Sequence, residues 1–195
     1  MPRNIMLLNP EDYYTQRNNR FEPYGACMNT ARVMFYIAAR IPYSNPTGLS
    51  DDDYFFTMLN TSDAKEFALR KYPNLSDYPP QEIHGMYGSY LDKVLTGKRR
   101  TDFRTDLTWN RFVFELKHGN PVMTSGKFPG LDGHAFVFVG YDEKTDELIA
   151  ADPWGNPHLG YKSPEGQKGY GIRYNRKYFN EHVKPGENKW GHILL

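Results

Sequence analysis

The sequence has 195 residues, of which 39% are hydrophobic, and its formal net charge is +1 from 24 basic and 23 acidic side chains. This composition excludes a disordered chain and offers no broad basic face for nucleic acid. The single cysteine, Cys27, excludes an internal disulfide bond and a multi-cysteine zinc site. We therefore expect one globular domain over residues 1–195, without a metal ion, a cofactor or a nucleic-acid partner.

The N-terminal part contains one short apolar run, residues 5–8, and then a turn-rich stretch, "NPEDYYTQRNNRFEPYG". The run is too short for a signal peptide or a membrane span, and no other stretch approaches that length. We expect a chain that is cytoplasmic at synthesis, has no integral membrane segment, and reaches the cell envelope, if at all, by another route. The turn-rich stretch predicts irregular structure.

Helices are expected in the first 120 residues. Apolar residues at helical spacings predict a largely buried helix over residues 26–40, which Pro42 ends. Ser50 and three aspartates, residues 51–53, begin the next predicted helix, because acidic side chains in a first turn stabilise the positive end of a helix. The same aspartates are a weaker candidate for a cation site. The further helices are predicted over residues 51–59, 64–71, 80–95 and 109–118.

The last 75 residues have a different pattern, in which short β-rich segments are separated by turns. The change from helices to strands along the chain predicts an α+β class with an antiparallel sheet. Between the first two strands, "GKFPGLDG" predicts a mobile loop that leads to His134 and lines a substrate groove. The strands are expected over residues 121–126, 134–141, 147–152, 169–174 and 190–195.

A predicted hairpin brings a histidine and an aspartate together. If its turn is centred on residues 142–145, His134 faces Asp152 or Pro153, and a register one residue shorter places His134 directly opposite Asp152. Opposed residues have Cβ atoms about 4.5–5.5 Å apart on one face of the sheet. The strand over residues 135–141 is apolar on both faces, which is typical of a central, covered strand. A polar pair at strand ends also closes many hairpins without a catalytic role.

Cys27 stands where a glycine-containing turn gives way to the first long helix. A lone cysteine is usually a small buried hydrophobe, but a helix N-terminus carries partial positive charge that stabilises a thiolate. A nearby imidazole takes and returns the proton, and a carboxylate holds the imidazole in one tautomer. Cys27, His134 and Asp152 supply these three roles. The candidates for an oxyanion donor are the backbone N–H of Cys27 and the side-chain amides of Gln16, Asn18 and Asn19.

Two segments, "TQRNNRFEPYGACMNTA" and "DGHAFVFVGYDEKTDELIAADPWGN", carry a resemblance to a known family, with a weaker match in "GYGIRYNRKYF". The sequence resembles the papain-like cysteine peptidases, and within them the bacteriocin-processing (double-glycine) peptidase-like branch, including small members carried by bacteriophages. The family pattern is fitted by Gln16, Asn19, Gly25, Cys27, Thr30, Gly133, His134, Gly140, Tyr141, Asp142, Asp152, Pro153, Trp154 and Gly155.

The resemblance implies a papain-like fold, in which a helical part containing the nucleophile helix packs on a C-terminal antiparallel sheet. It implies that Cys27 is the nucleophile and His134 the general base, while Asp152 orients His134 and Gln16 completes the oxyanion hole. The sequence departs from the family pattern at Met28 and in the long spacing between Gln16 and Cys27. We expect the substrate site to be lined by Met28, Gly133, Trp154 and Asn19.

The expected function is a monomeric cysteine peptidase that hydrolyses peptide bonds through an acyl-enzyme. The resemblance to phage-carried members favours bacterial cell-wall peptides as the substrate, as for an endolysin. Two alternatives stay open: a binding module that keeps the fold without turnover, and an acyltransferase that uses an amine instead of water. The sequence does not separate hydrolysis from transfer, because the first half-reaction is shared.

Overall fold

The computed structural model describes residues 3–71, 80–162, 168–183 and 189–195. Every helix expected from the sequence is present, with ends within two residues of the prediction. One further helix, α6, follows the fourth expected strand. The helices are α1 (Cys27–Ala38), α2 (Asp51–Leu59), α3 (Ser62–Lys71), α4 (Pro80–Thr96), α5 (Trp109–Lys117) and α6 (Arg176–His182), with short 3-10 turns η1 (Pro10–Asp12), η2 (Gln16–Asn18) and η4 (Pro157–Leu159).

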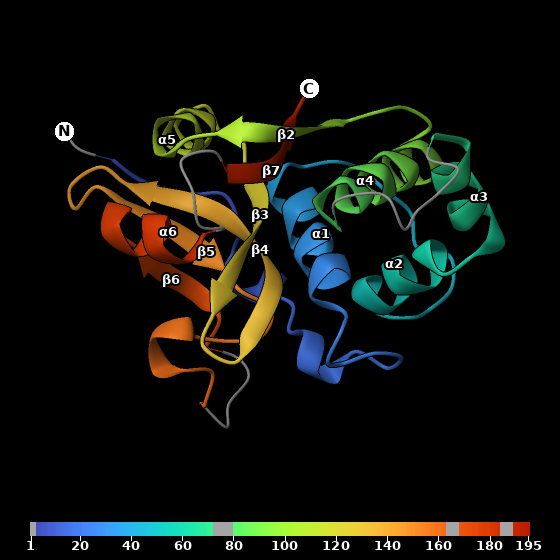
Figure 1. The fold of residues 1–195 in the computed structure, drawn as a ribbon, viewed down its shortest axis with the longest axis horizontal. Helices are drawn as coiled ribbons and strands as arrows, with labels where there is room; N and C mark the ends of the chain where they lie inside the picture. Colours follow the sequence, from blue (N-terminus) through green and yellow to red (C-terminus); the bar gives the residue numbers. More distant parts are fainter. Residues whose placement is uncertain (1–2, 72–79, 163–167, 184–188) are drawn as a thin grey trace.

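The strands form an antiparallel sheet in the order β2-β7-β3-β4-β5-β6, and β1 pairs with β4. The α+β prediction is confirmed: helices from the first part of the chain pack on this sheet (Figure 1). Two of its strands, β1 and β2, were not predicted. The strands are β1 (Asn4–Met6), β2 (Thr101–Leu107), β3 (Val122–Phe128), β4 (Leu131–Asp142), β5 (Glu147–Ala151), β6 (Tyr170–Tyr174) and β7 (Lys189–Leu194).

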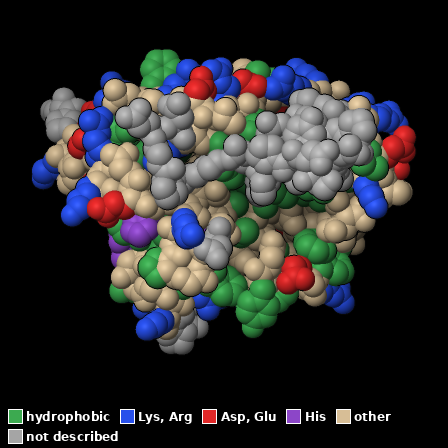
Figure 2. Space-filling model, viewed as in Figure 1, with side chains coloured by type: hydrophobic (Ala, Val, Ile, Leu, Met, Phe, Trp, Pro, Cys, Tyr) green, Lys and Arg blue, Asp and Glu red, His purple; other side chains and the backbone are tan. Residues whose placement is uncertain are grey.

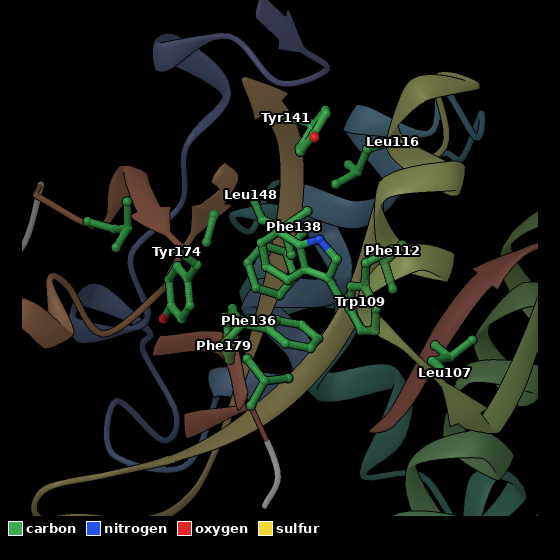
Figure 3. Packing of buried hydrophobic residues seen from close by; sticks show 14 of the residues in the cluster. Leu107, Trp109, Phe112, Leu116, Phe136, Phe138, Tyr141, Leu148, Tyr174 and Phe179 are labelled. Atoms are coloured by element: carbon green, nitrogen blue, oxygen red, sulfur yellow. The ribbon is translucent and has the colours of Figure 1, made fainter. Parts of the chain in front are cut away.

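The central strand β4 is covered on both faces, as its apolar sequence predicts. Phe136 and Phe138 point into a cluster with α5 and α6, where the rings of Phe112 and Phe138 meet edge to face with centroids 5.5 Å apart (Figure 3). Val137 and Val139 belong to the opposite cluster, which contains α1 and α2. Burial of such side chains contributes about 1.5–3 kcal/mol each, so β4 and α1 are fixed firmly against each other.

The hairpin of β4 and β5 differs from its predicted register. The turn lies at residues 143–146, because Asp146 adopts a left-handed conformation (φ 53°) and Asp142 stays in the strand, opposite Glu147. A bulge follows between Phe138 and Gly140, and the ladder ends where Val137 pairs with Ala151. His134 is therefore not directly opposite Asp152, and the predicted pairing was wrong by two residues.

The stretch predicted as a mobile loop is instead the second hairpin of the site. β3 and β4 pair up to Phe128 and Leu131, so that only Pro129 and Gly130 turn the chain, the latter with φ 82°. Gly126 pairs with His134 across this hairpin. His134 is consequently held within a strand and not in a loop. No helix among the described residues is long and apolar enough to cross a membrane.

Candidate active site

Cys27 is the first residue of α1, and a tight turn presents it. The backbone N–H groups of Gly25 and Ala26 both donate to the carbonyl oxygen of Glu22, at 3.1 and 2.9 Å. A Cβ atom on Gly25 would lie 2.8 Å from Cγ of Glu22, so glycine suits this turn. The turn places the Cys27 sulfur at the helix N-terminus, where unpaired N–H groups and the helix dipole favour a thiolate.

The thiol of Cys27 interacts with the imidazole of His134, and each group shifts the pKa of the other. Burial alone raises the pKa of the thiol, but the hydrogen bond to His134, the charge of that ring and a backbone N–H of Ala135 together lower it below its ordinary value. A lowered pKa raises the fraction of thiolate, which is the nucleophilic form of cysteine. The structure thus brings together two residues that lie far apart in the sequence.

His134 Nε2 lies 2.6 Å from Oδ1 of Asp152, and both side chains are buried, with exposed fractions of 3% and 0%. Because an ionised carboxylate only accepts, Nε2–H is the donor and Nδ1 is left for the thiol. Burial lowers the pKa of His134, but the charge and hydrogen bond of Asp152, with those of Cys27, raise it to about 10. The lowered pKa of the thiol and the raised pKa of the imidazole both favour a thiolate–imidazolium pair.

Asp152 is held by more groups than the sequence indicated. The backbone N–H of Trp154 donates to Oδ1 at 2.8 Å, and the hydroxyl of Tyr161 donates to Oδ2 at 3.2 Å. The hydroxyl of Tyr13 donates to the backbone oxygen of Asp152 at 2.8 Å. Tyr161 has a positive φ of 58°, which is rare for a tyrosine and typical of strained functional loops.

Sequence reasoning missed both tyrosines, because neither lies at a recognisable spacing from Asp152. The one sequence signal for a close contact at Asp152 was Gly169, which begins the segment "GYG". Its carbonyl oxygen accepts from the backbone N–H of Asp152 at 2.8 Å, and a Cβ atom there would collide with the Asp152 backbone. Only glycine allows the two chain segments to approach this closely.

Gln16 lies between the Cys27 turn and the loop after Asp152. It is 2% exposed, its Nε2 donates to the carbonyl of Pro23 at 3.0 Å, and its backbone N–H donates to Pro153 at 3.0 Å. Its Oε1 is buried without a hydrogen-bond partner. The second hydrogen of Nε2 remains able to donate to an oxyanion. The contacts of Gln16 therefore permit the oxyanion role, which stays a prediction.

The predicted substrate-lining residues lie in different surroundings. Asn19 is buried: its Nδ2 donates to Asp52 at 3.2 Å, and its Oδ1 accepts from two backbone N–H groups of the loop. Its observed contacts order the loop before Cys27. Met28 is half-buried against the α1 side of the core, Gly133 is exposed at the start of β4, and Trp154 is half-buried beside Asp152. Their contact with substrate stays a prediction.

The three aspartates at the start of α2 tie the N-terminal segment to the helix. Asp51 accepts from the hydroxyl of Tyr43 at 2.7 Å, and Asp53 accepts from the backbone N–H of Arg20 at 2.7 Å. Within the described parts of the chain, no three acidic, histidine or cysteine side chains are grouped as a metal site. The interpretation of this run as a helix start is confirmed.

Comparison with models of protein families matches residues 12–180 to the Peptidase_C39 like family. The chain belongs to this family of cysteine peptidases. The matched region contains Cys27, His134 and Asp152, and the prediction of a thiol peptidase is confirmed. Among solved structures, xylellain, a cysteine protease from Xylella fastidiosa, is similar with 15% sequence identity and a TM-score of 0.49, over 100% of this chain and 86% of that chain. A search of curated proteins gave no match.

Proposed function

We propose that this cysteine peptidase uses Cys27 as its nucleophile, His134 as general acid and base, and Asp152 to orient His134. The observation that carries the proposal is the buried His134–Asp152 pair, with 2.6 Å between Nε2 and Oδ1, whose imidazole interacts with the Cys27 thiol so that each shifts the pKa of the other. The lowered thiol pKa and the raised imidazole pKa are the shifts that this chemistry needs.

In the first half-reaction the Cys27 thiolate attacks the carbonyl carbon of the substrate amide. The oxyanion that forms is stabilised by the backbone N–H of Cys27 and the side-chain amide of Gln16. His134 then donates its Nδ1 proton to the leaving nitrogen, the C–N bond breaks, and an acyl thioester remains on Cys27.

In the second half-reaction neutral His134 removes a proton from water, which attacks the thioester. The C–S bond breaks, the acyl fragment leaves as a carboxylic acid, and the thiolate–imidazolium pair is restored. Asp152 stays ionised throughout and stabilises the imidazolium.

The substrate class that we propose is bacterial cell-wall peptide, cleaved in the manner of a phage lysin. Support comes from the motif resemblance, in which the Gly-His strand and the Asp-Pro-Trp-Gly turn are similar to those of small phage-carried members. A lysin made in the cytoplasm and released through a separate pore fits this proposal.

The test is mass spectrometry of purified peptidoglycan and of an unrelated protein, casein, after incubation with wild type or Cys27→Ala. We expect new amine and carboxylate ends in peptidoglycan with wild type alone. The products without an added nucleophile distinguish hydrolysis from acyl transfer, because hydrolysis gives carboxylate ends whereas transfer joins the acyl fragment to an amine of the substrate as a new amide. Hydroxamates formed with added hydroxylamine would show the acyl-enzyme that both reactions share. Equal product from the two proteins would refute the catalytic assignment, whereas cleavage of casein alone would refute only the cell-wall substrate.

A further inference from the structure

A small pocket opens beside the catalytic residues. Its volume is about 240 Å³, and it is lined by Arg17, Pro23, Tyr24 and Trp154. Pockets for drug-sized ligands have about 300–1,000 Å³, so this one suits a smaller group, such as one residue of a peptide. Tyr24 is 83% exposed, and hydrophobic side chains reach the surface along the lower edge of the face in Figure 2.

Hydrogen bonds connect the pocket walls to the reacting groups. The backbone N–H of Trp154 donates to the same Asp152 oxygen that holds His134. The carbonyl of Pro23 accepts from Gln16, the predicted oxyanion donor. Since His134 gives its proton to the leaving amine, groups at the His134–Asp152 end of the site face the leaving fragment.

Arg17 is a cation without an acidic partner among the described residues. Its Nε donates to the carbonyl of Trp154 at 2.9 Å, and its Nη2 donates to the carbonyl of Tyr161 at 3.0 Å. Its guanidinium carbon lies 4.4 Å from the centre of the Trp154 ring. These contacts fix the guanidinium in place and leave Nη1 with no acceptor in the described chain.

A fixed guanidinium with donors to spare is suited to a carboxylate, which it binds in a planar, charge-assisted geometry. The Trp154 ring covers one face of the guanidinium, and the Tyr24 ring lies beside it with the two ring centroids 5.8 Å apart, so the pocket wall is partly apolar and such a pair is less screened than in open water. We infer that this pocket binds a carboxylate on the leaving fragment of the substrate, with Arg17 as the cation that selects it. This inference rests on the proposed peptidase mechanism for the direction of the substrate.

The test measures binding separately from turnover. Immobilised Cys27→Ala is given a library of short peptides with free carboxylates and the same library converted to carboxamides, and the retained peptides are counted by mass spectrometry. We expect about tenfold more retention of the carboxylates, the effect of one charge-assisted contact at a partly exposed site. The retained peptides are then digested with wild type, and the carboxylate whose conversion to carboxamide abolishes retention should lie on the fragment that carries the new amine.

Variants made in the Cys27→Ala protein identify the cation. Arg17→Gln keeps a donor for the Trp154 carbonyl but removes the charge, and the retention ratio should fall to about one. Arg17→Lys keeps the positive charge, so part of the preference for carboxylates over carboxamides should remain. The matched control is Arg70→Gln on α3, an exposed arginine paired with Glu66, and its ratio should be unchanged.

The inference is overturned by equal retention of the two libraries, by an unchanged ratio in Arg17→Gln, or by peptides in which the carboxylate needed for retention lies on the acyl fragment, apart from the new terminal carboxylate that hydrolysis creates there. Cleavage by wild type without any carboxylate preference removes the inference and leaves the proposed function standing. Selective retention of carboxylates without any cleavage by wild type would refute the proposed function, because Arg17 would then recognise a ligand that the protein does not cleave.

Discussion

His134 Nε2 and Asp152 Oδ1 lie 2.6 Å apart although the two residues are not opposite each other in the sheet. The ladder of β4 and β5 ends at Val137 and Ala151, and its continuation places Asp152 beside Phe136. His134 lies two residues further along β4, on the same face as Phe136. Its ring therefore reaches Asp152 diagonally across the two strands, a distance that long side chains can bridge. The pair therefore depends on which face the residues share more than on direct opposition.

Replacing Asp152 by asparagine should separate charge from shape. The side chain keeps its size, but the negative charge that raises the pKa of His134 is lost. We expect kcat to fall by about 10²–10⁴-fold, as for asparagine in place of the aspartate of a serine triad. Steady-state kinetics measure this change, and circular dichroism checks the fold. Wild-type kcat in a folded Asp152→Asn protein would contradict the assigned role.

The pH profile of kcat/KM should be a broad bell. The active form needs Cys27 ionised, so the acidic limb lies below the ordinary thiol range, because hydrogen bonding to His134 lowers the Cys27 pKa despite burial. It also needs His134 protonated, so activity is lost as the pH rises through the His134 pKa, which is raised to about 10. Initial rates at low substrate concentration, measured from acidic to alkaline pH, give both limbs. A basic limb near the unperturbed histidine value of about 6.5 would be evidence against the ion pair.

Tyr161→Phe should weaken catalysis without removing a catalytic group. Loss of the hydroxyl leaves Oδ2 of Asp152 without the donor at 3.2 Å, and one such hydrogen bond is worth about 0.5–1.5 kcal/mol. We expect kcat to fall by roughly 2–10-fold and the basic limb, which reports the His134 pKa, to shift to higher pH, because a carboxylate that has lost one donor attracts the imidazolium more strongly. Tyr170→Phe is the matched control, since its hydroxyl donates to the carbonyl of Leu8. Equal effects of the two substitutions would mean that Tyr161 has only a structural role.

Gly169→Ala should reduce both stability and activity. A Cβ atom there collides with the backbone of Asp152, and overpacking at such a contact costs about 1–3 kcal/mol in free energy of unfolding. Gly133→Ala is the control for stability, because no atom lies within 4 Å of the added carbon. Chemical denaturation compares the two, and Gly169→Ala with wild-type stability would contradict the close approach of the two chain segments.

A buried arginine in α1 gives a prediction for the scaffold behind the nucleophile. Arg32 is 2% exposed and lies 3.0 Å from Nδ1 of His192 on β7 through its Nη2, with the buried carboxylate of Asp92 as a charge partner. Asp92 also accepts hydrogen bonds from the hydroxyls of Tyr36 and Thr101 and from the backbone N–H groups of Arg100 and Thr101. Asp92→Asn leaves the Arg32 charge less compensated and replaces one accepting oxygen by an NH₂ group, and a buried donor left unsatisfied costs about 1–3 kcal/mol. We expect a large fall in the free energy of unfolding, measured in urea. The exposed Asp106→Asn on β2 should change it little.

The helices and the proximity of His134 to Asp152 could be predicted from the sequence, because the signals for helices are local and those for strands have a period of two. Acidic residues, proline and glycine marked helix ends, and the hairpin kept His134 and Asp152 on one face although the register was wrong by two. An error of one residue would have moved Asp152 to the opposite face. The error arose at Asp146, whose left-handed conformation no pattern announced.

Other features could not be predicted because they depend on contacts between distant segments. The sequence of β2 lacks a clear alternation of apolar and polar residues. It is an edge strand, and its exposed arginine forms ion pairs with two aspartates of the same strand. The hydroxyls of Tyr13 and Tyr161 reach Asp152 only when three loops meet. Gln16 was named from resemblance, and its burial between two loops is evident only in the folded chain.

The hydrogen bonds from the N-terminal segment to the loop after Asp152 have a consequence for synthesis. Cys27 leaves the ribosome long before His134 and Asp152 are made, so the nascent chain carries an ordinary thiol and no partner to ionise it. The pairing of such distant segments also makes folding slow compared with local structure. Activity should therefore begin only after translation has passed β6, and a ribosome-bound chain that ends before β6 should react with thiol-directed probes only at the rate of an ordinary cysteine.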